Sequence, residues 1–332
     1  MNESPFLSIV IPVYNGEDRI SRCLESIWSQ GLEPGSYEII CVDDCSTDGT
    51  VALLEKLQRE HGDLRVLKNA ANLRAGGSRN HGVRKARGEY VLFIDADDYF
   101  HSGSLKKACS FLQKHQLDIL MCDFARETEA HSSTQLIHHF KNREVLSGRM
   151  FLLKNSLPYS PWKYLFRKQL MVVREIFFEE KVCCEDVDWT HRMALAAETM
   201  QYVPILLVHN VLNDYSTTAN EHRTLKSVSD KFFAGFRLLI LAEQYQQYPE
   251  IASRLTEVAT EYYRQGIRYM AAVYAPISQK QNVLCQYIPN NYTLIQKIKM
   301  TKKFSFLFAL LSNLAAPFVQ HLISFKRKYA GR

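Results

Sequence analysis

The stretch that decides the fold is Tyr90–Phe100, which reads YVLFIDADDYF. Its first five residues form a continuous apolar run, too short for an ordinary helix and suited to a strand buried on both faces of a parallel sheet. Three carboxylates then follow within four residues, at Asp95, Asp97 and Asp98. Their mutual repulsion at the end of a buried strand is unfavourable unless a cation or hydrogen-bond donors offset it. The pattern therefore predicts either a ligand site at the carboxyl end of this strand or a solvated acidic turn.

The residues before this stretch alternate between strand and helix patterns. Apolar runs predict strands at 6–15, 38–42 and 65–67. Apolar residues at helical spacing predict helices at 16–30, 51–61 and 78–87, with a polar loop at 69–77. Such alternation predicts an α/β fold with a doubly wound, Rossmann-like and mainly parallel sheet flanked by helices.

A second strand also ends in carboxylates, because Asp43 and Asp44 follow residues 38–42. The carboxyl ends of parallel strands meet at one edge of the sheet, so this pair should line one crevice with the acidic residues after Ile94. Magnesium is commonly held by one or two carboxylates together with substrate phosphates. The sequence therefore predicts a divalent cation and a phosphate-bearing ligand at this edge.

The later part of the chain continues the alternation less regularly. Helices are predicted at 104–115 and 147–155, strands at 117–124 and 202–208, a loop with a short strand at 158–166, and mostly helix at 225–300. Residues 125–145 are polar and predict an irregular excursion. Glu185, Asp186 and Asp188 open a helix, where the macrodipole favours anions, so they form either a further acidic part of the site or a simple helix cap.

The composition is that of an ordinary globular protein. The 332 residues are 46% hydrophobic and 23% charged, which suits one large domain or two of moderate size. The eight cysteines show no CxxC spacing and lie mostly in apolar runs, which indicates reduced core residues. The first residues, MNESP, lack the basic and apolar regions of a secretory signal. We therefore expect a cytoplasmic protein.

The charge is unevenly distributed along the chain. No Asp or Glu follows Glu261, whereas eleven Lys or Arg do, so residues 262–332 carry +11 against a total of +6. Within this tail, residues 304–325 are largely apolar and long enough to span a bilayer, but polar residues interrupt them. We expect residues 297–332 to bind an anionic membrane surface, which would place the protein on the inner face of the cell membrane. The alternative is a C-terminal core helix with basic ends. The apolar segment argues against nucleic acid as the partner of the tail.

Four motifs match one known family in order and spacing. They are SIVIPVYNGE (8–17), VDDCSTDGT (42–50), NLRAGGSRNHGVRKARGEYVLFIDADD (72–98) and CEDVDW (184–189). Over residues 6–210 the chain resembles the family 2 glycosyltransferases of the GT-A fold. The resemblance implies a catalytic domain at 1–220. The helical pattern of the later residues, which carry no motif of the family, predicts a helical C-terminal region at 221–332. The resemblance also implies inverting transfer of one sugar from a nucleotide-sugar, most often a UDP-sugar, to a glycan or lipid-linked acceptor in cell-surface polysaccharide synthesis.

The same resemblance assigns residues to the donor. Pro12 and Tyr14 would line the nucleotide pocket, and Asp44 would hydrogen-bond the base. Asn72 and Arg79 fall in the stretch that faces the nucleotide.

A second group of residues would carry the metal and the chemistry. Asp95 and Asp97 would form the DxD motif that binds the donor and Mg²⁺ or Mn²⁺, with Asp97 as the direct ligand. Asp98 would be either an alternate ligand or a residue that supports the ligands. The metal would neutralise the charge that develops on the departing nucleoside diphosphate. Asp186 would be the catalytic base for the acceptor hydroxyl. Residues near the acceptor would be Trp162, Lys163 and Glu185.

Other functions remain as alternatives. A dinucleotide-dependent oxidoreductase would need a GxGxxG turn after the first strand, but that turn reads PVYNGE. A non-catalytic scaffold that binds a sugar nucleotide or a membrane would not need the acidic residues, all of which are present. The chain lacks the QxxRW motif and the several spanning helices of processive synthases, so we expect one sugar per encounter. Many members of the family carry a basic residue that contacts the diphosphate shortly after the last strand of the catalytic domain. The corresponding segment here, 208–218, has no Lys or Arg, and His209 would either take that role or be structural.

Overall fold

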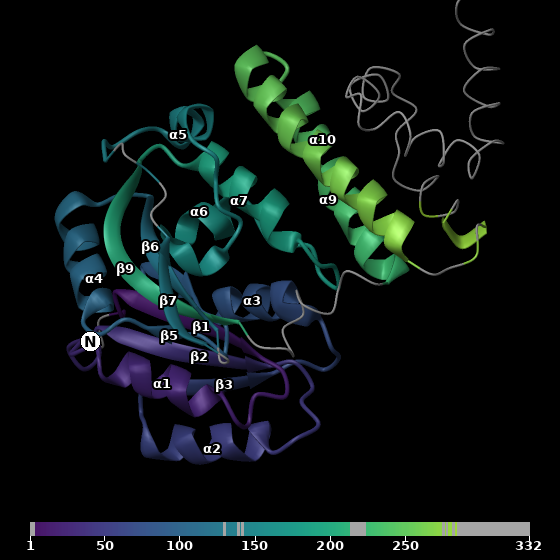
Figure 1. Cartoon of the computed structure of the whole chain (residues 1–332). Helices are drawn as coiled ribbons and strands as arrows, with labels where there is room; N and C mark the ends of the chain where they lie inside the picture. Colours follow the sequence, from purple (N-terminus) through teal and green to yellow (C-terminus); the bar gives the residue numbers. More distant parts are fainter. Residues whose placement is uncertain are drawn as a thin grey trace, which may run out of the picture. The chain divides into compact units, whose positions relative to one another are not determined.

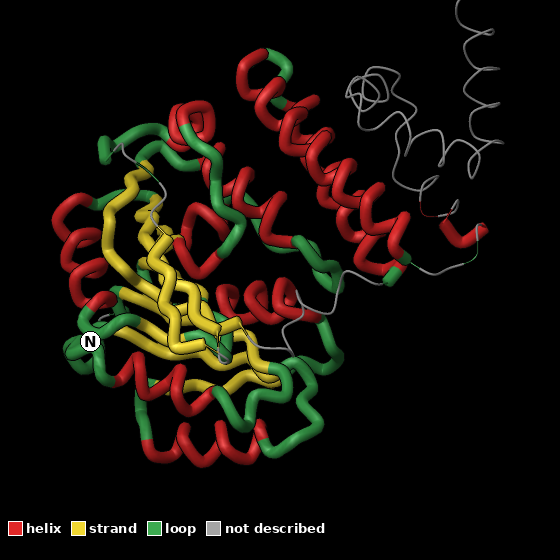
Figure 2. Tube along the Cα trace, in the orientation of Figure 1, coloured by secondary structure: helices red, strands yellow, loops and turns green. Residues whose placement is uncertain are grey.

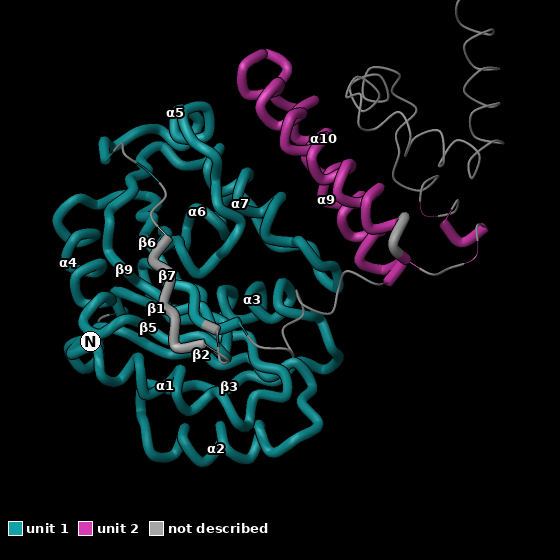
Figure 3. Tube along the Cα trace, viewed as in Figure 1, with its two compact units in different colours: residues 1–214 teal, residues 215–332 magenta. Residues whose placement is uncertain are grey.

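The computed structural model describes residues 4–273 apart from 129–130, 138–139, 141–142 and 213–223, and also positions 276, 278–280 and 283. The chain divides into two compact units, Met1–Asp214 and Tyr215–Arg332 (Figure 3). The predicted boundary at residue 220 falls in a stretch outside the described residues and stays a prediction.

The first unit is built on one nine-stranded sheet with helices on both faces (Figures 1 and 2). The strands are β1 (Leu7–Val13), β2 (Tyr37–Asp43), β3 (Leu64–Lys68), β4 (Tyr90–Phe93), β5 (Tyr99–Phe100), β6 (Ile119–Thr128), β7 (His131–Ile137), β8 (Tyr164–Arg167) and β9 (Met200–Leu212). Their order is β3-β2-β1-β4-β8-β6-β9-β5, and β7 pairs with β6. Strands β1 to β4, β6 and β9 run in one direction and the other three run against them. The predicted mainly parallel sheet is therefore confirmed.

Alternate residues of the strands face different helices, as the two-residue period of a strand requires. The helices are α1 (Ile20–Trp28), α2 (Thr50–Glu60), α3 (Arg74–Lys85), α4 (Ser104–His115), α5 (Gly148–Lys154), the short η1 (Pro161–Lys163), α6 (Lys168–Val173) and α7 (Glu185–Ala196). Ile9, Cys41 and Leu92 share a buried cluster with side chains of α1, α2 and α4. Phe93 points the other way and contacts Trp189 of α7. Both faces of β4 are buried, as its apolar run predicts.

Helix α3 lies unusually close to the sheet because Gly82 has no side chain. A Cβ atom at this position would lie 2.3 Å from Val10 Cγ1. The helix begins at Arg74, earlier than the predicted residue 78, because Asp44 at the end of β2 accepts a hydrogen bond of 2.8 Å from the Leu73 N–H. A carboxylate at a helix N-terminus satisfies a donor that the helix itself leaves unpaired.

The prediction of an irregular excursion at 125–145 was wrong in its first half. Strand β6 continues to Thr128, and β7 pairs with it in an antiparallel hairpin. The same part of β6 runs parallel to the end of β9, where Phe124 pairs with Val208. These strand pairings provide hydrogen-bond partners for the backbone N–H and C=O groups of polar residues that show no strand pattern of their own. The helices predicted at 104–115 and 147–155 are confirmed.

The described part of the second unit is a helical hairpin, α9 (Leu225–Gln244) and α10 (Pro249–Ala272) (Figure 1). Glycines permit the close packing of the two helices, since a Cβ atom at Gly266 would lie 2.9 Å from the Phe232 ring. No helix in the described part of the chain is long and apolar enough to cross a membrane. Residues 297–332, with the apolar segment 304–325, lie outside the described residues.

At the amino ends of the strands, the buried carboxylate of Glu38 joins several segments. It accepts hydrogen bonds from Ser8 Oγ at 2.7 Å, from the Arg87 N–H at 2.6 Å and from the Arg65 guanidinium at 3.0 Å. Burial acts to raise the pKa of Glu38, but the hydrogen bonds from Arg87, Ser8 and Arg65 outweigh it and lower the pKa below its ordinary value. This carboxylate therefore holds β1, β2, β3 and the turn before β4 together.

We expect Glu38→Gln to lower the free energy of unfolding by about 1–3 kcal/mol at neutral pH, because it replaces an ionised acceptor inside a hydrogen-bonded network. A lowered folded-state pKa stabilises the fold fully above the unfolded value of 4.5 and loses this contribution as the pH falls through the folded value. In urea unfolding, the gap between wild type and variant should therefore shrink towards about pH 3. Glu33→Gln, at an exposed site, is the control and should change little. An equal gap at both pH values would contradict the assignment.

Candidate active site

The loops that follow β1 and β2 form one rigid structure at the carboxyl edge of the sheet. Asp44 N–H donates to the Val13 carbonyl at 2.8 Å, and Asn15 Oδ1 accepts from the Thr47 N–H at 2.8 Å. Pro12 is partly buried in β1, whereas the Tyr14 ring is 53% exposed beside these loops. The structure thus places Pro12 and Tyr14 on the loop-side end of β1 near Asp44, with Tyr14 about half exposed.

Asp44 is the centre of a buried polar cluster. One of its carboxylate oxygens, Oδ1, accepts from Asn69 Nδ2 and from the Leu73 N–H, each at 2.8 Å. Asn72 Nδ2 donates to the Asp44 carbonyl at 3.1 Å. Sequence analysis missed Asn69, although its position directly after β3, at the same edge of the sheet, is a signal that could have identified it. The cluster fixes Asp44 in one orientation.

The acidic residues after β4 divide into two kinds. The Asp95 side chain is 35% exposed, and Asp97 is partly exposed. Asp98 is only 1% exposed and accepts hydrogen bonds from the Val211 N–H at 2.9 Å and from Asn210 Nδ2 at 3.1 Å. Burial raises the pKa of Asp98 well above its ordinary value, and repulsion from Asp95 and Asp97 adds to the effect. Asp98 thus anchors the acidic turn to β9, and the other two lie nearer to solvent.

Two carboxylates fit a cation whose coordination is completed by a ligand. Within the described ranges, no group of three or more His, Cys, Asp or Glu residues is arranged to hold a metal ion on its own. Asp95 and Asp97 offer hard oxygen atoms from one turn, and Mg²⁺ binds in this way when phosphates supply further oxygens. The donor set is therefore suited to Mg²⁺ or Mn²⁺ in the presence of a diphosphate.

Arg79 of α3 joins this turn to the start of α7. Its two terminal nitrogens donate to Asp95 Oδ1 at 2.7 Å and to Glu185 Oε1 at 2.9 Å, and the side chain is 5% exposed. Burial would lower the pKa of Arg79, but Asp95, Glu185 and Asp186 together raise it above its ordinary value. Gly76 provides the space, since a Cβ atom there would lie 2.9 Å from Glu185 Cγ. Acidic motifs far apart in the sequence thus meet around one guanidinium.

The three acidic residues that open α7 have different surroundings. Asp186 is partly exposed and close enough to Arg79 to influence its pKa. Burial raises the pKa of Glu185, and Arg79 only partly opposes that effect. Asp188 is 5% exposed and accepts from Arg192 Nε at 2.8 Å, so it forms an ion pair within the helix. Glu185 is thus paired with Arg79 and Asp188 with Arg192, and Asp186 is partly exposed between them.

The predicted acceptor residues of η1 are buried. Trp162 is 6% exposed and packs edge-to-face on Phe124, with ring centroids 4.8 Å apart. Lys163 is fully buried with its Nζ 4.2 Å from the centroid of the same ring. Burial lowers the pKa of Lys163 to about 7, and no hydrogen-bond acceptor among the described residues reaches its Nζ. Both side chains thus contribute to the core beneath the site.

His209 belongs to a network that sequence analysis did not foresee. Its Nδ1 pairs with Glu127 Oε1 at 2.8 Å, and its Nε2 with His101 Nδ1 at 3.0 Å. Its ring stacks on Tyr99 at 4.6 Å, directly after the acidic turn. Both ring nitrogens are therefore engaged inside the protein. Residues 213–223, which follow β9, lie outside the described residues.

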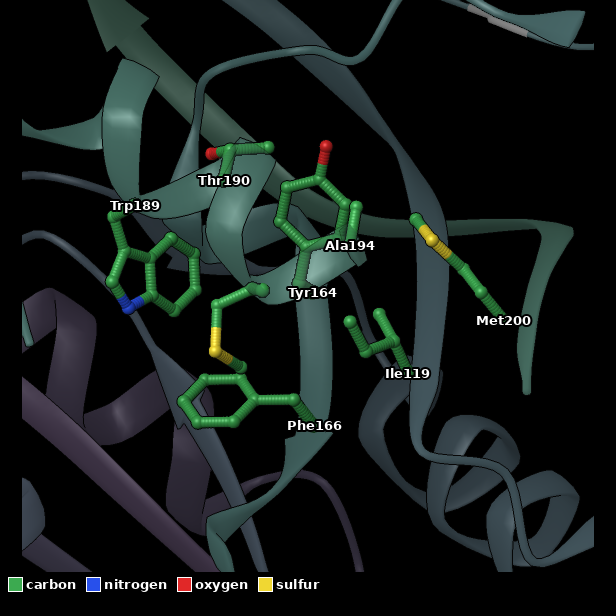
Figure 4. Close-up of a pocket in the computed structure, with 8 residues that line it drawn as sticks. Ile119, Tyr164, Phe166, Trp189, Thr190, Ala194 and Met200 are labelled. Atoms are coloured by element: carbon green, nitrogen blue, oxygen red, sulfur yellow. The ribbon is translucent and has the colours of Figure 1, made fainter. Parts of the chain in front are cut away.

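A small cavity behind α7 is not the substrate site (Figure 4). It measures ≈ 10 Å³, which is room for about one water molecule. Apolar side chains dominate its lining, which consists of Ile119, Tyr164, Phe166, Trp189, Thr190, Met193, Ala194 and Met200. A sugar nucleotide cannot enter it, so this cavity is a packing feature of the helix that carries Asp186.

Comparisons with known proteins agree with this architecture. The poly(ribitol-phosphate) β-glucosyltransferase of Bacillus spizizenii is 42% identical over 35% of this chain and 18% of its own length. The poly(ribitol-phosphate) β-N-acetylglucosaminyltransferase TarS of Staphylococcus aureus is 31% identical over 71% of this chain and 40% of its own length. The chain thus spans less than half the length of these two relatives. An uncharacterized glycosyltransferase of Escherichia coli, YibD, is 27% identical over 77% of this chain and 78% of its own length.

Solved structures show the same fold. The crystal structure of S. aureus TarS residues 1–349 in complex with UDP-GlcNAc matches with a TM-score of 0.66 and 23% identity, over 86% of this chain and 82% of that one. The fold is therefore GT-A-like, with a helical C-terminal region, as predicted. The family described as Glycosyl transferase family 2 matches residues 8–177, about half of the chain. The chain belongs to glycosyltransferase family 2.

Proposed function

We propose that the protein is an inverting transferase that moves one sugar from a UDP-sugar to a hydroxyl of a glycan or lipid-linked acceptor in cell-surface polysaccharide synthesis. The observation that carries the proposal is the bridge from Asp95 through Arg79 to Glu185, which brings the DxD turn and the start of α7 to one place. The name of the relative TarS and its structure with UDP-GlcNAc support the donor and acceptor classes.

The donor base would bind at the cluster around Asp44. Since Asn69 and Leu73 hold one carboxylate oxygen, the other can accept a hydrogen bond from the N–H of uracil. The exposed Tyr14 ring and Pro12 offer apolar surface for the base, and Asn72 lies on the same side. This part of the site selects the nucleotide.

The diphosphate would lie beside the acidic turn. Asp97 and Asp95 would hold Mg²⁺ or Mn²⁺, which neutralises negative charge on the departing nucleoside diphosphate. Asp98 would act mainly by anchoring the turn, because its oxygens already accept two hydrogen bonds from β9.

Asp186 would accept the proton of the acceptor hydroxyl as that oxygen attacks the anomeric carbon. The bond to the diphosphate breaks on the opposite face of the sugar, so a single displacement inverts the configuration. Glu185 would orient the start of α7 next to the acceptor. The burial of Trp162 and Lys163 suits a supporting role under the acceptor side.

We further propose a cytoplasmic protein that associates peripherally with the inner membrane face through residues 297–332. The net charge of +11 after Glu261 supports attraction to anionic lipids. No observation in the described site favours a non-catalytic scaffold or nucleic acid as a partner.

We expect Asp186→Asn to lower the rate of sugar transfer by about 10²–10⁴-fold, because the variant loses its general base but keeps its shape. UDP affinity, measured by calorimetry, should stay near that of the wild type. Glu180→Gln, at an exposed position shortly before α7, is the matched control and should transfer normally. Unchanged transfer by the Asp186 variant would exclude this residue as the base.

Metal and nucleotide class can be tested together by thermal unfolding. We expect UDP-glucose or UDP-N-acetylglucosamine with Mn²⁺ to raise the unfolding temperature more than GDP-mannose or dTDP-glucose does, because bound ligand stabilises the folded state. Asp97→Asn should remove the part of the stabilisation that chelation with EDTA removes. Stabilisation by GDP-mannose alone, or full stabilisation in EDTA, would contradict the proposal.

A further inference from the structure

Both terminal nitrogens of Arg79 are paired with protein carboxylates. The resemblance to the family places it on the nucleotide, yet its terminal nitrogens donate to Asp95 and Glu185 at 2.7 and 2.9 Å. The side chain is 5% exposed, and its Nε is buried without a hydrogen-bond partner among the described residues. A direct bond to a donor would have to use one of the remaining N–H groups of a side chain that is only 5% exposed.

Aromatic rings fix the guanidinium from the side of α7. Its Cζ lies 5.5 Å from the Phe178 ring centroid, and Phe178 stacks on Trp189 of α7 at 4.6 Å. Phe178 is also tied to α3, because its N–H donates to Asn80 Oδ1 and its carbonyl accepts from Asn80 Nδ2, both at 2.9 Å. The start of α7, the segment before it and α3 therefore form one rigid assembly around Arg79.

The charges make this assembly dependent on the guanidinium. Asp95 Oδ1 lies 2.7 Å and Glu185 Oε1 2.9 Å from the two terminal nitrogens of Arg79. Without the cation these carboxylates would repel one another in a largely buried place, and the turn after β4 would separate from α7.

We infer that Arg79 is a positioning residue for the transfer reaction. Its ion pairs with Asp95 and Glu185 set the distance between the DxD turn and the base Asp186. The inference rests on the proposed function and adds a role that differs from donor binding. Lysine cannot replace it, because a single ammonium lacks the planar fork that reaches two carboxylates at once. A small displacement of a catalytic group lowers turnover steeply, by about 10²-fold for 1 Å.

The first test separates positioning from donor binding. The assay measures UDP released from the UDP-sugar that best stabilises the wild type. We expect Arg79→Lys to lower kcat in this assay by about 100-fold. Its Kd for UDP with Mn²⁺, measured by calorimetry, should change by less than about 3-fold. Arg84→Met removes an exposed arginine of the same helix and should match the wild type in both measurements. If UDP affinity falls by the same factor as kcat, Arg79 binds the donor directly. If kcat does not change, Arg79 is not a positioning residue.

The second test does not depend on activity. The unfolding temperatures of wild type, Arg79→Met, Glu185→Gln and the double variant form a double-mutant cycle. We expect the double variant to lose less than the sum of the two single losses, since neutral Glu185→Gln no longer needs the cation. If the losses in unfolding temperature are additive, Arg79 and Glu185 do not stabilise each other. The positioning role would then be wrong even if the enzyme is active. A wild type that binds no UDP and releases none would instead overturn the proposed function, and the inference with it.

Discussion

Placing several carboxylates at one edge of a buried sheet is electrostatically unfavourable, and the architecture of the first unit follows from how that repulsion is offset. Asp44 receives a hydrogen bond from the start of α3, and Asp98 receives one from the end of β9. Asp95 and Glu185 share the guanidinium of Arg79. Each pairing also ties a loop to an element distant in sequence. The same interactions that neutralise the acidic groups therefore determine the shape of the site.

The acidic residues of the site differ in burial. Asp98 and Asp188 are buried and committed to partners within the protein. Asp97 and Asp186 are partly exposed, on the two sides of the Arg79 bridge. A sugar nucleotide between them would meet a cation on its diphosphate and a base near its anomeric carbon, as a single in-line displacement requires.

The sequence predicts the parallel half of the fold well, because each strand there is a short apolar run followed by polar turn residues. The position of Asp44 and Asp95 at a common edge follows from that topology alone. The bridge through Arg79 is not predictable in this way, since it depends on how closely Gly76 and Gly82 let α3 approach its neighbours.

The hairpin of β6 and β7 and the network of His209 were missed for a related reason. The residues of β7 and the end of β6 are mostly polar, and Glu127 of β6 pairs with His209, which lies about eighty residues away. Periodicity within a segment carries no information about such contacts. The early start of α3 is similar, because Asp44, which accepts the hydrogen bond at its start, follows the distant strand β2.

The central claim is that the acidic residues from separate parts of the chain surround one nucleotide-sugar. Its most direct test is a crystal structure of the protein with UDP and Mn²⁺. We predict an anomalous manganese signal at Asp95 and Asp97, the uracil ring at Asp44, and the carboxylate of Asp186 facing the open end of the diphosphate. Manganese elsewhere, or a nucleotide bound away from Asp44, would contradict the account.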